Sequence, residues 1–104
     1  MALQGEVYWV TFGLADDGHF SVRHSRLLKA IQAAAVGNVW QESTSFCMFR
    51  SRLSIDALIA DLGSAVRSDL DFLLLGMPFH KSARLFGHWR DDRVRNLMHF
   101  AELA

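Results

Sequence analysis

The alternation of apolar and polar positions along the chain predicts strands and helices in a regular order. Residues 7–14 (VYWVTFGL) are nearly all apolar and rich in β-branched and aromatic side chains, which is typical of a central strand buried on both faces. The Asp-Asp-Gly sequence at residues 16–18 ends this strand with strong turn chemistry. Residues 25–36 follow with an apolar stripe at helical spacing, so we expect a helix that packs on the sheet.

The pattern continues with a pair of strands, a second helix and another strand. We expect a short strand at 39–41, a tight turn and a longer strand at 44–50. Ser54 is suited to cap a helix whose apolar stripe extends to Val66, and residues 70–77 predict the next strand. This order predicts an α+β fold with a ferredoxin-like βαββαβ core, in which helices cover one face of an antiparallel sheet.

The chain continues beyond this core with apolar and basic residues. Residues 82–89 predict a further short strand, and a terminal helix follows. We therefore expect a single domain over residues 1–104, with a core at about 6–77 and a C-terminal strand and helix extension at about 78–104. Eight residues of the helical stripes and central strands are predicted to be buried: Val10, Phe12, Leu28, Ile31, Leu58, Leu62, Phe72 and Leu74.

Composition restricts the classes of function. The chain has 104 residues, no net charge at pH 7 and one cysteine, Cys47, so it has neither the strongly basic balance of many nucleic-acid-binding domains nor an intrachain disulfide. The first residues lack the basic segment and apolar run of a signal peptide, and the longest apolar run is too short to span a membrane. We therefore predict a cytoplasmic protein with no membrane partner.

Asp16 and Asp17 are the first candidates for chemistry. Carboxylates at a strand end suit a hard cation, and such acids from two chains could hold one magnesium ion. The commoner role of adjacent Asp residues before Gly is a solvated turn. No Cys or His spacing matches a metal-binding motif, and Cys47 is expected to be a buried thiol. No cofactor is predicted, except magnesium if the protein is the ribonuclease considered below.

A group of basic residues in the extension is the second candidate. Lys81, Arg84, Arg90 and Arg93 are close together in the sequence, with aromatic residues between them. Basic and aromatic side chains together can bind single-stranded nucleic acid through its phosphates and by stacking on its bases. Two aspartates interrupt the group, so a solvated helix face with packed aromatic residues is the alternative.

Three segments resemble a group of small ferredoxin-like proteins that includes the SinR-like proteins, the VapD toxins and the small CRISPR adaptation subunit. The segments are VYWVTFGLADDG, VWQESTSFCMF and SDLDFLLLGM, within about residues 7–75. The resemblance implies a homodimer of ferredoxin-like units, often with a final strand exchanged or added across the interface. For some members it also implies a metal-dependent ribonuclease with an acid near the end of the first strand. Here Gly13 occupies that position and has no ligand atom.

Two functions of different class follow from these observations. The first is a small non-catalytic homodimeric module, associated with nucleic acid or acting as a toxin–antitoxin accessory protein. The alternative is a magnesium-dependent endoribonuclease with Asp16 or Asp17 paired across a dimer. The absence of an acid at Gly13 and the neutral charge favour the first. The apolar residues of the extension predict a homodimer through residues 78–100, unless the extension packs on its own sheet.

Overall fold

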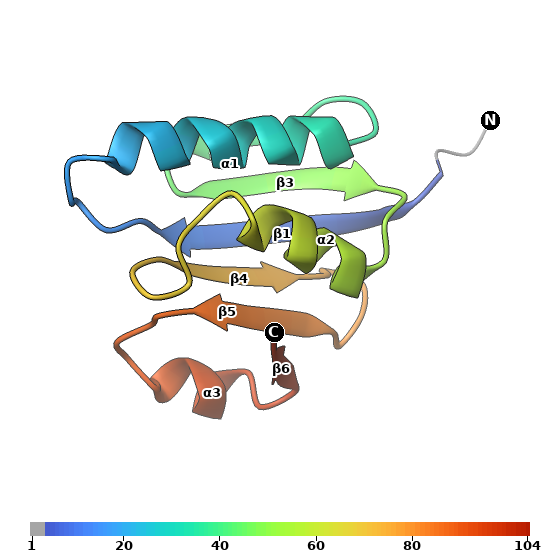
Figure 1. Ribbon diagram of the computed structural model, residues 1–104. Helices are drawn as coiled ribbons and strands as arrows, with labels where there is room; N and C mark the ends of the chain where they lie inside the picture. Colours follow the sequence, from blue (N-terminus) through green and yellow to red (C-terminus); the bar gives the residue numbers. More distant parts are fainter. Residues whose placement is uncertain (1–3) are drawn as a thin grey trace.

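The protein has an α+β fold built on one six-stranded sheet, as shown by a computed structural model that describes residues 4–104 (Figure 1). The strands are β1 (Glu6–Gly13), β2 (Trp40–Ser43), β3 (Phe46–Ser51), β4 (Phe72–Gly76), β5 (Ala83–Gly87) and β6 (Ala101–Leu103), and the helices are α1 (Phe20–Ala34), α2 (Ile55–Gly63) and α3 (Arg93–Leu97). Helices α1 and α2 lie in front of the same face of the sheet, whereas α3 lies beyond β5.

The sheet is mixed, and the expectation of an antiparallel sheet is therefore wrong for the complete domain. The strand order is β2-β3-β1-β4-β5-β6. Every neighbouring pair from β2 to β5 is antiparallel, but β6 is parallel to β5. The reason is the segment 88–100, which carries the chain through α3 to the end of the sheet at which β5 began, so that β6 runs in the same direction as β5.

The main core lies between the sheet and the two long helices. Tyr8, Val10 and Phe12 alternate along β1 and are buried in one cluster with residues of α1 and α2. Leu28 and Leu62 both contact this cluster, which confirms that the two helices cover the same face. The buried members of the cluster from the helices are Leu27, Ile31, Leu58, Ile59 and Leu62.

Two of the burial predictions need correction. Leu28 is only half-buried, because Leu27 takes the inward position on α1, and Phe72 is also half-buried. Leu74 is buried as predicted, but on the opposite face of the sheet from the helices. The strand β1 is not buried equally on both sides, since Trp9, on its second face, is only partly buried. A uniformly apolar strand therefore has one closed and one partly open face.

Local chemistry explains two helix starts. Helix α1 begins at Phe20 rather than near residue 25, after a turn in which Oδ1 of Asp17 accepts a hydrogen bond from the backbone N–H of His19 at 3.0 Å. Helix α2 begins as predicted, with Ser54 as its N-cap accepting from the N–H of Ala57 at 3.2 Å.

The C-terminal extension packs within its own chain. Strand β5 pairs with β4 and so completes the sheet of the same molecule, and α3 is a short helix of five residues. Trp89, Val94 and Met98 pack on a small cluster formed by residues of β4 and β5 on the open face. Among the described residues, no helix is long and apolar enough to cross a membrane.

Candidate functional site

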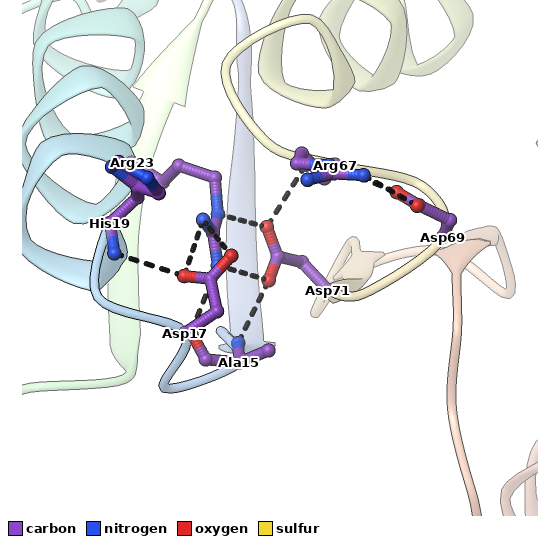
Figure 2. Close-up of polar contacts among 7 residues, drawn as sticks. All are labelled: Ala15, Asp17, His19, Arg23, Arg67, Asp69 and Asp71. Atoms are coloured by element: carbon purple, nitrogen blue, oxygen red, sulfur yellow. Dashed lines mark hydrogen bonds and ion pairs between the residues drawn. The ribbon is translucent and has the colours of Figure 1, made fainter.

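A buried ion network lies at the end of the sheet where β1 finishes (Figure 2). It consists of Arg23 on α1, Asp71 just before β4 and Asp17 in the loop after β1. Nε of Arg23 donates to Oδ2 of Asp71 at 2.8 Å, and its Nη2 donates to Oδ1 at 3.2 Å. Arg23 is 4% exposed and Asp71 is fully buried. This two-contact geometry is the one that makes Arg–carboxylate pairs strong.

The rest of the ion network is also fully hydrogen-bonded. Asp71 accepts from the backbone N–H groups of Ala15 at 2.8 Å and Arg67 at 2.9 Å. Arg23 donates from Nη2 to the carbonyl of Ala15 and from Nη1 to both oxygens of Asp17. Within residues 4–104, no buried side-chain nitrogen or oxygen lacks a partner. The ion network therefore joins three segments of the chain and leaves no buried polar atom for a ligand.

Both acids of the ion network are held in the charged form. Burial by itself would raise the pKa of Asp71, but hydrogen bonds from Arg23 and from the backbone of Arg67 and Ala15 outweigh it, and the pKa lies below its ordinary value. The pKa of Asp17 is lowered by the backbone N–H of His19 and by the Arg23 guanidinium. The charged pair is thus the resting state near neutral pH.

The metal role predicted for Asp16 or Asp17 stays a prediction, but the two side chains have different surroundings. The oxygens of Asp17 are already used by a guanidinium and a backbone N–H. Asp16 is exposed at the margin of a surface groove. Nowhere in the part of the chain that the structure describes do three or more His, Cys, Asp or Glu residues gather as metal ligands. A metal at Asp17 would first have to displace Arg23.

The resemblance implies an acid at position 13, and the packing around this position explains why glycine is found there instead. Gly13 pairs with Phe72 across β1 and β4, and a methyl group added to Gly13 would overlap the Phe72 ring. An aspartate here would meet the same ring. Glycine at position 13 therefore leaves room for the Phe72 ring on the open face of the sheet, and an acid would not.

An apolar groove of about 970 Å³ is hollowed into the open face of the sheet. Its lining comes from the ends of β1, β4 and β5 and from α3. The C-terminal extension, residues 78–104, therefore forms part of its wall. Leu97 stands on its α3 wall and is 86% exposed. We call this surface the apolar groove, and its main apolar lining residues are Phe72, Leu74, Leu85, Trp89, Val94 and Leu97.

Next to the apolar groove, three aromatic side chains form a row across the first strands of the sheet. We call Trp40 of β2, Phe46 of β3 and Trp9 of β1 the aromatic row. The Trp9 and Phe46 rings are nearly parallel, with centroids 6.4 Å apart, and the Trp40 ring meets Phe46 edge-on at 6.0 Å. Trp40 is 52% exposed. The row is thus a partly solvated surface rather than part of the core.

The four basic candidates are not equivalent in the structure. Arg84 is held by Asp56 of α2 at 2.7 Å and by Glu102 of β6 at 2.9 Å, so it ties α2 to the edge of the sheet. Arg93 forms an ion pair with Asp91. Lys81 and Arg90 are exposed and have no ion pair with another described residue. Arg84 and Arg93 are therefore engaged by acidic side chains, whereas Lys81 and Arg90 are not.

Cys47 and two of the histidines, His24 and His80, make contacts within the fold. Cys47 is buried, as expected, and burial raises the pKa of its thiol, which disfavours the reactive thiolate. Nε2 of His24 lies 3.0 Å from the carbonyl oxygen of Thr44 and so links α1 to the β2–β3 turn. His80 faces Glu6 at 3.2 Å.

Sequence reasoning missed both the ion network and the aromatic row. Asp71 lies directly before the apolar strand β4, and this position was a signal for burial. Its partner Arg23 is 48 residues away, and nothing in the sequence around Arg23 predicts the pairing. Trp9, Trp40 and Phe46 were visible as aromatic residues in strands, yet only the pairing register places them on one face. Comparisons with protein-family models, with curated proteins and with solved structures find no match for this chain.

Proposed function

We propose that the protein is a small non-catalytic homodimeric module with a ferredoxin-like core. The strand order β2-β3-β1-β4, antiparallel throughout and covered by α1 and α2, supports the ferredoxin-like assignment. The observation that carries the dimer is the apolar groove, whose α3 wall presents Leu97 almost completely to solvent. A contiguous apolar surface with a polar rim is typical of an interaction site.

A second copy of the chain fits the apolar groove by charge as well as by hydrophobicity. The margin of the groove carries Arg90 and Arg93 but also Asp16 and Asp91. In a two-fold dimer the same surface is used twice, so a patch that carries both signs can match its own copy. The chain has no net charge, so long-range repulsion between copies is absent.

The extension contributes to this dimer differently from the strand exchange that the resemblance implies. Strand β5 is already paired with β4 of its own chain. What the extension offers to a second copy is therefore a surface made of Trp89, Val94 and Leu97, within the predicted range of 78–100.

The non-catalytic assignment is supported by two features at the end of β1 and in the loop that follows it. Asp17 is engaged by Arg23, and Gly13 is required by the packing of Phe72. Purified protein should therefore not cleave single-stranded RNA with or without magnesium. Magnesium-dependent cleavage that disappears in Asp16→Asn or Asp17→Asn would establish the ribonuclease alternative instead.

Sedimentation at micromolar concentration tests the dimer. We expect a species of twice the 11.8 kDa chain mass and a shift to monomer in Leu97→Asp, because a charge placed in a buried apolar contact is strongly unfavourable. Phe79→Asp is the matched control, since Phe79 is 74% exposed but lies outside the groove. A monomeric wild type, or a Leu97→Asp variant that remains a dimer, contradicts the assignment.

A further inference from the structure

The aromatic row lies outside the helix-covered core and shares no lining residue with the apolar groove. Trp40 lies in β2, an edge strand of four residues that are all exposed. Its Cα register places it opposite Met48, which in turn faces Trp9 across β3 and β1. The three rings therefore lie on adjacent strands of the face that α1 and α2 leave uncovered.

The backbone is adapted to hold one of these rings over the sheet. Trp9 pairs with Gly76 of β4, and a methyl group at Gly76 would overlap the Trp9 indole. Gly76 has no side chain, so the large ring can lie across the neighbouring strand. Trp9 thereby connects the cluster on β4 and β5 to Phe46, with which it is nearly parallel.

Two cations form no ion pair with another described residue: Arg50, on a strand of the aromatic row, and Lys81, in the turn that follows β4. Arg50 follows Phe46 and Met48 on the same face of β3, because inward and outward positions alternate along that strand. Its Nη1 donates to the carbonyl of Gly5 at 3.0 Å, and no ion pair joins it to another described residue. Lys81 is exposed in the turn between β4 and β5, which begins directly after Gly76.

From this arrangement we propose that the aromatic row binds single-stranded nucleic acid, with bases stacking on Trp40 and Phe46 and phosphates contacting Arg50 and Lys81. Every base has a π-face, so exposed rings on an open sheet can bind bases with little sequence preference. Cations beside the rings match the negative charge of the backbone, which supplies the salt-dependent part of the affinity. A double helix would not fit this mode because its bases are already stacked on each other.

This inference differs from the sequence prediction of a basic cluster in the extension. Arg84 is committed to Asp56 and Glu102, and Arg93 to Asp91. Of the other two basic residues of that cluster, Arg90 lines the apolar groove and not the aromatic row, and only Lys81 is part of the proposed surface. The inference also does not rest on the dimer, because the apolar groove and the aromatic row share no lining residue.

Fluorescence anisotropy with labelled single-stranded DNA and RNA of about twelve nucleotides, within the usual site size, tests the proposal in low salt. Wild-type protein should bind both, and the loss of one stacked base in Trp40→Ala or Phe46→Ala should weaken binding about tenfold. Phe20→Ala, at an exposed aromatic residue of α1 on the opposite side of the sheet, is the matched control and should bind normally. Arg50→Gln and Lys81→Gln should each reduce the salt dependence by about one counterion.

Thermal unfolding, tryptophan quenching and duplex competition separate a loss of binding from a loss of folding. Trp40 is largely exposed, so its replacement should leave the melting temperature nearly unchanged, and Leu97→Asp should bind normally whether or not it dimerises. In wild type, saturating oligonucleotide should quench tryptophan emission, and a duplex of the same length should compete weakly. The proposal is overturned if the wild type does not bind, or if Trp40→Ala and Phe46→Ala bind as tightly as the wild type. It is also overturned if a duplex competes as well as the single strand.

Discussion

The two faces of the sheet are made from the same strands but have different physical roles. On the helix-covered face, Tyr8, Val10 and Phe12 are buried against α1 and α2. One residue further along the same strand, Trp9 and Thr11 point to the open face and remain half-buried. The larger buried cluster lies on the first face, so we expect substitutions there to cost more stability than substitutions on the second, which leaves apolar and aromatic surface exposed.

The ion network strengthens this contrast because it belongs to the helix-covered side. Arg23 extends from α1 to Asp71, and the loop after β1 is hydrogen-bonded to both. These contacts link segments that are far apart in the sequence. Changes on this side should therefore affect folding, and changes on the open face should mainly affect association.

The largest effect is expected from Asp71→Asn. Removal of the carboxylate leaves Arg23 buried with an incomplete set of charged partners, which typically costs about 3–5 kcal/mol of unfolding free energy. Urea denaturation followed by circular dichroism measures the loss. Asp69→Asn is the matched control, because the Arg67–Asp69 pair is more than half exposed and is screened by solvent, so its loss should have little effect on stability.

Measuring the unfolding free energy of wild type and Asp71→Asn as a function of pH sharpens this test. The pKa of Asp71 is lower in the folded protein than in the unfolded chain, so its contribution is present above the ordinary aspartate pKa of about 3.9 and is lost as the pH falls through the lowered value. The difference in stability between wild type and Asp71→Asn should shrink over that range. A difference that stays constant down to the acid limit would contradict the charged state assigned to Asp71.

Leu62→Ala should have the next largest effect. Leu62 is completely buried between α2 and the sheet, and truncation of such a residue costs about 2–5 kcal/mol, depending on how far the site collapses. Leu97→Ala on the open side should change the unfolding free energy by less than about 0.5 kcal/mol, since Leu97 is a surface position. Equal losses in the two variants would remove the distinction between the faces.

Gly13→Ala should have an intermediate effect, smaller than that of Leu62→Ala. The added methyl group overlaps the ring of Phe72, and overpacking of this kind costs about 1–3 kcal/mol. Thermal unfolding of Gly13→Ala and of the double variant Gly13→Ala/Phe72→Leu measures the coupling. If the smaller side chain at position 72 does not reduce the cost of the substitution, the steric account of Gly13 is wrong.

Residue patterns predicted the order of the elements from β1 to β5 and most of the helix-covered core. The apolar stripe that includes Leu58 and Leu62 and the N-cap Ser54 locate α2 correctly, because helix periodicity and capping are local properties. Gly63 has a packing role that the sequence only suggested: it lies against the Phe86 ring of β5, where a larger residue would crowd the contact.

Only the tertiary structure decided how the strands and charges combine. Strand β6 is three residues long and is stabilised by its pairing with β5, so no local signal distinguishes it from coil. The pairing of Arg23 with Asp71, and of Trp9 with Phe46 and Gly76, depends on register between strands and on loop closure across tens of residues. Side-chain type and periodicity show which positions avoid water. They do not show which distant partners meet, because that choice is made by the packing of the whole sheet.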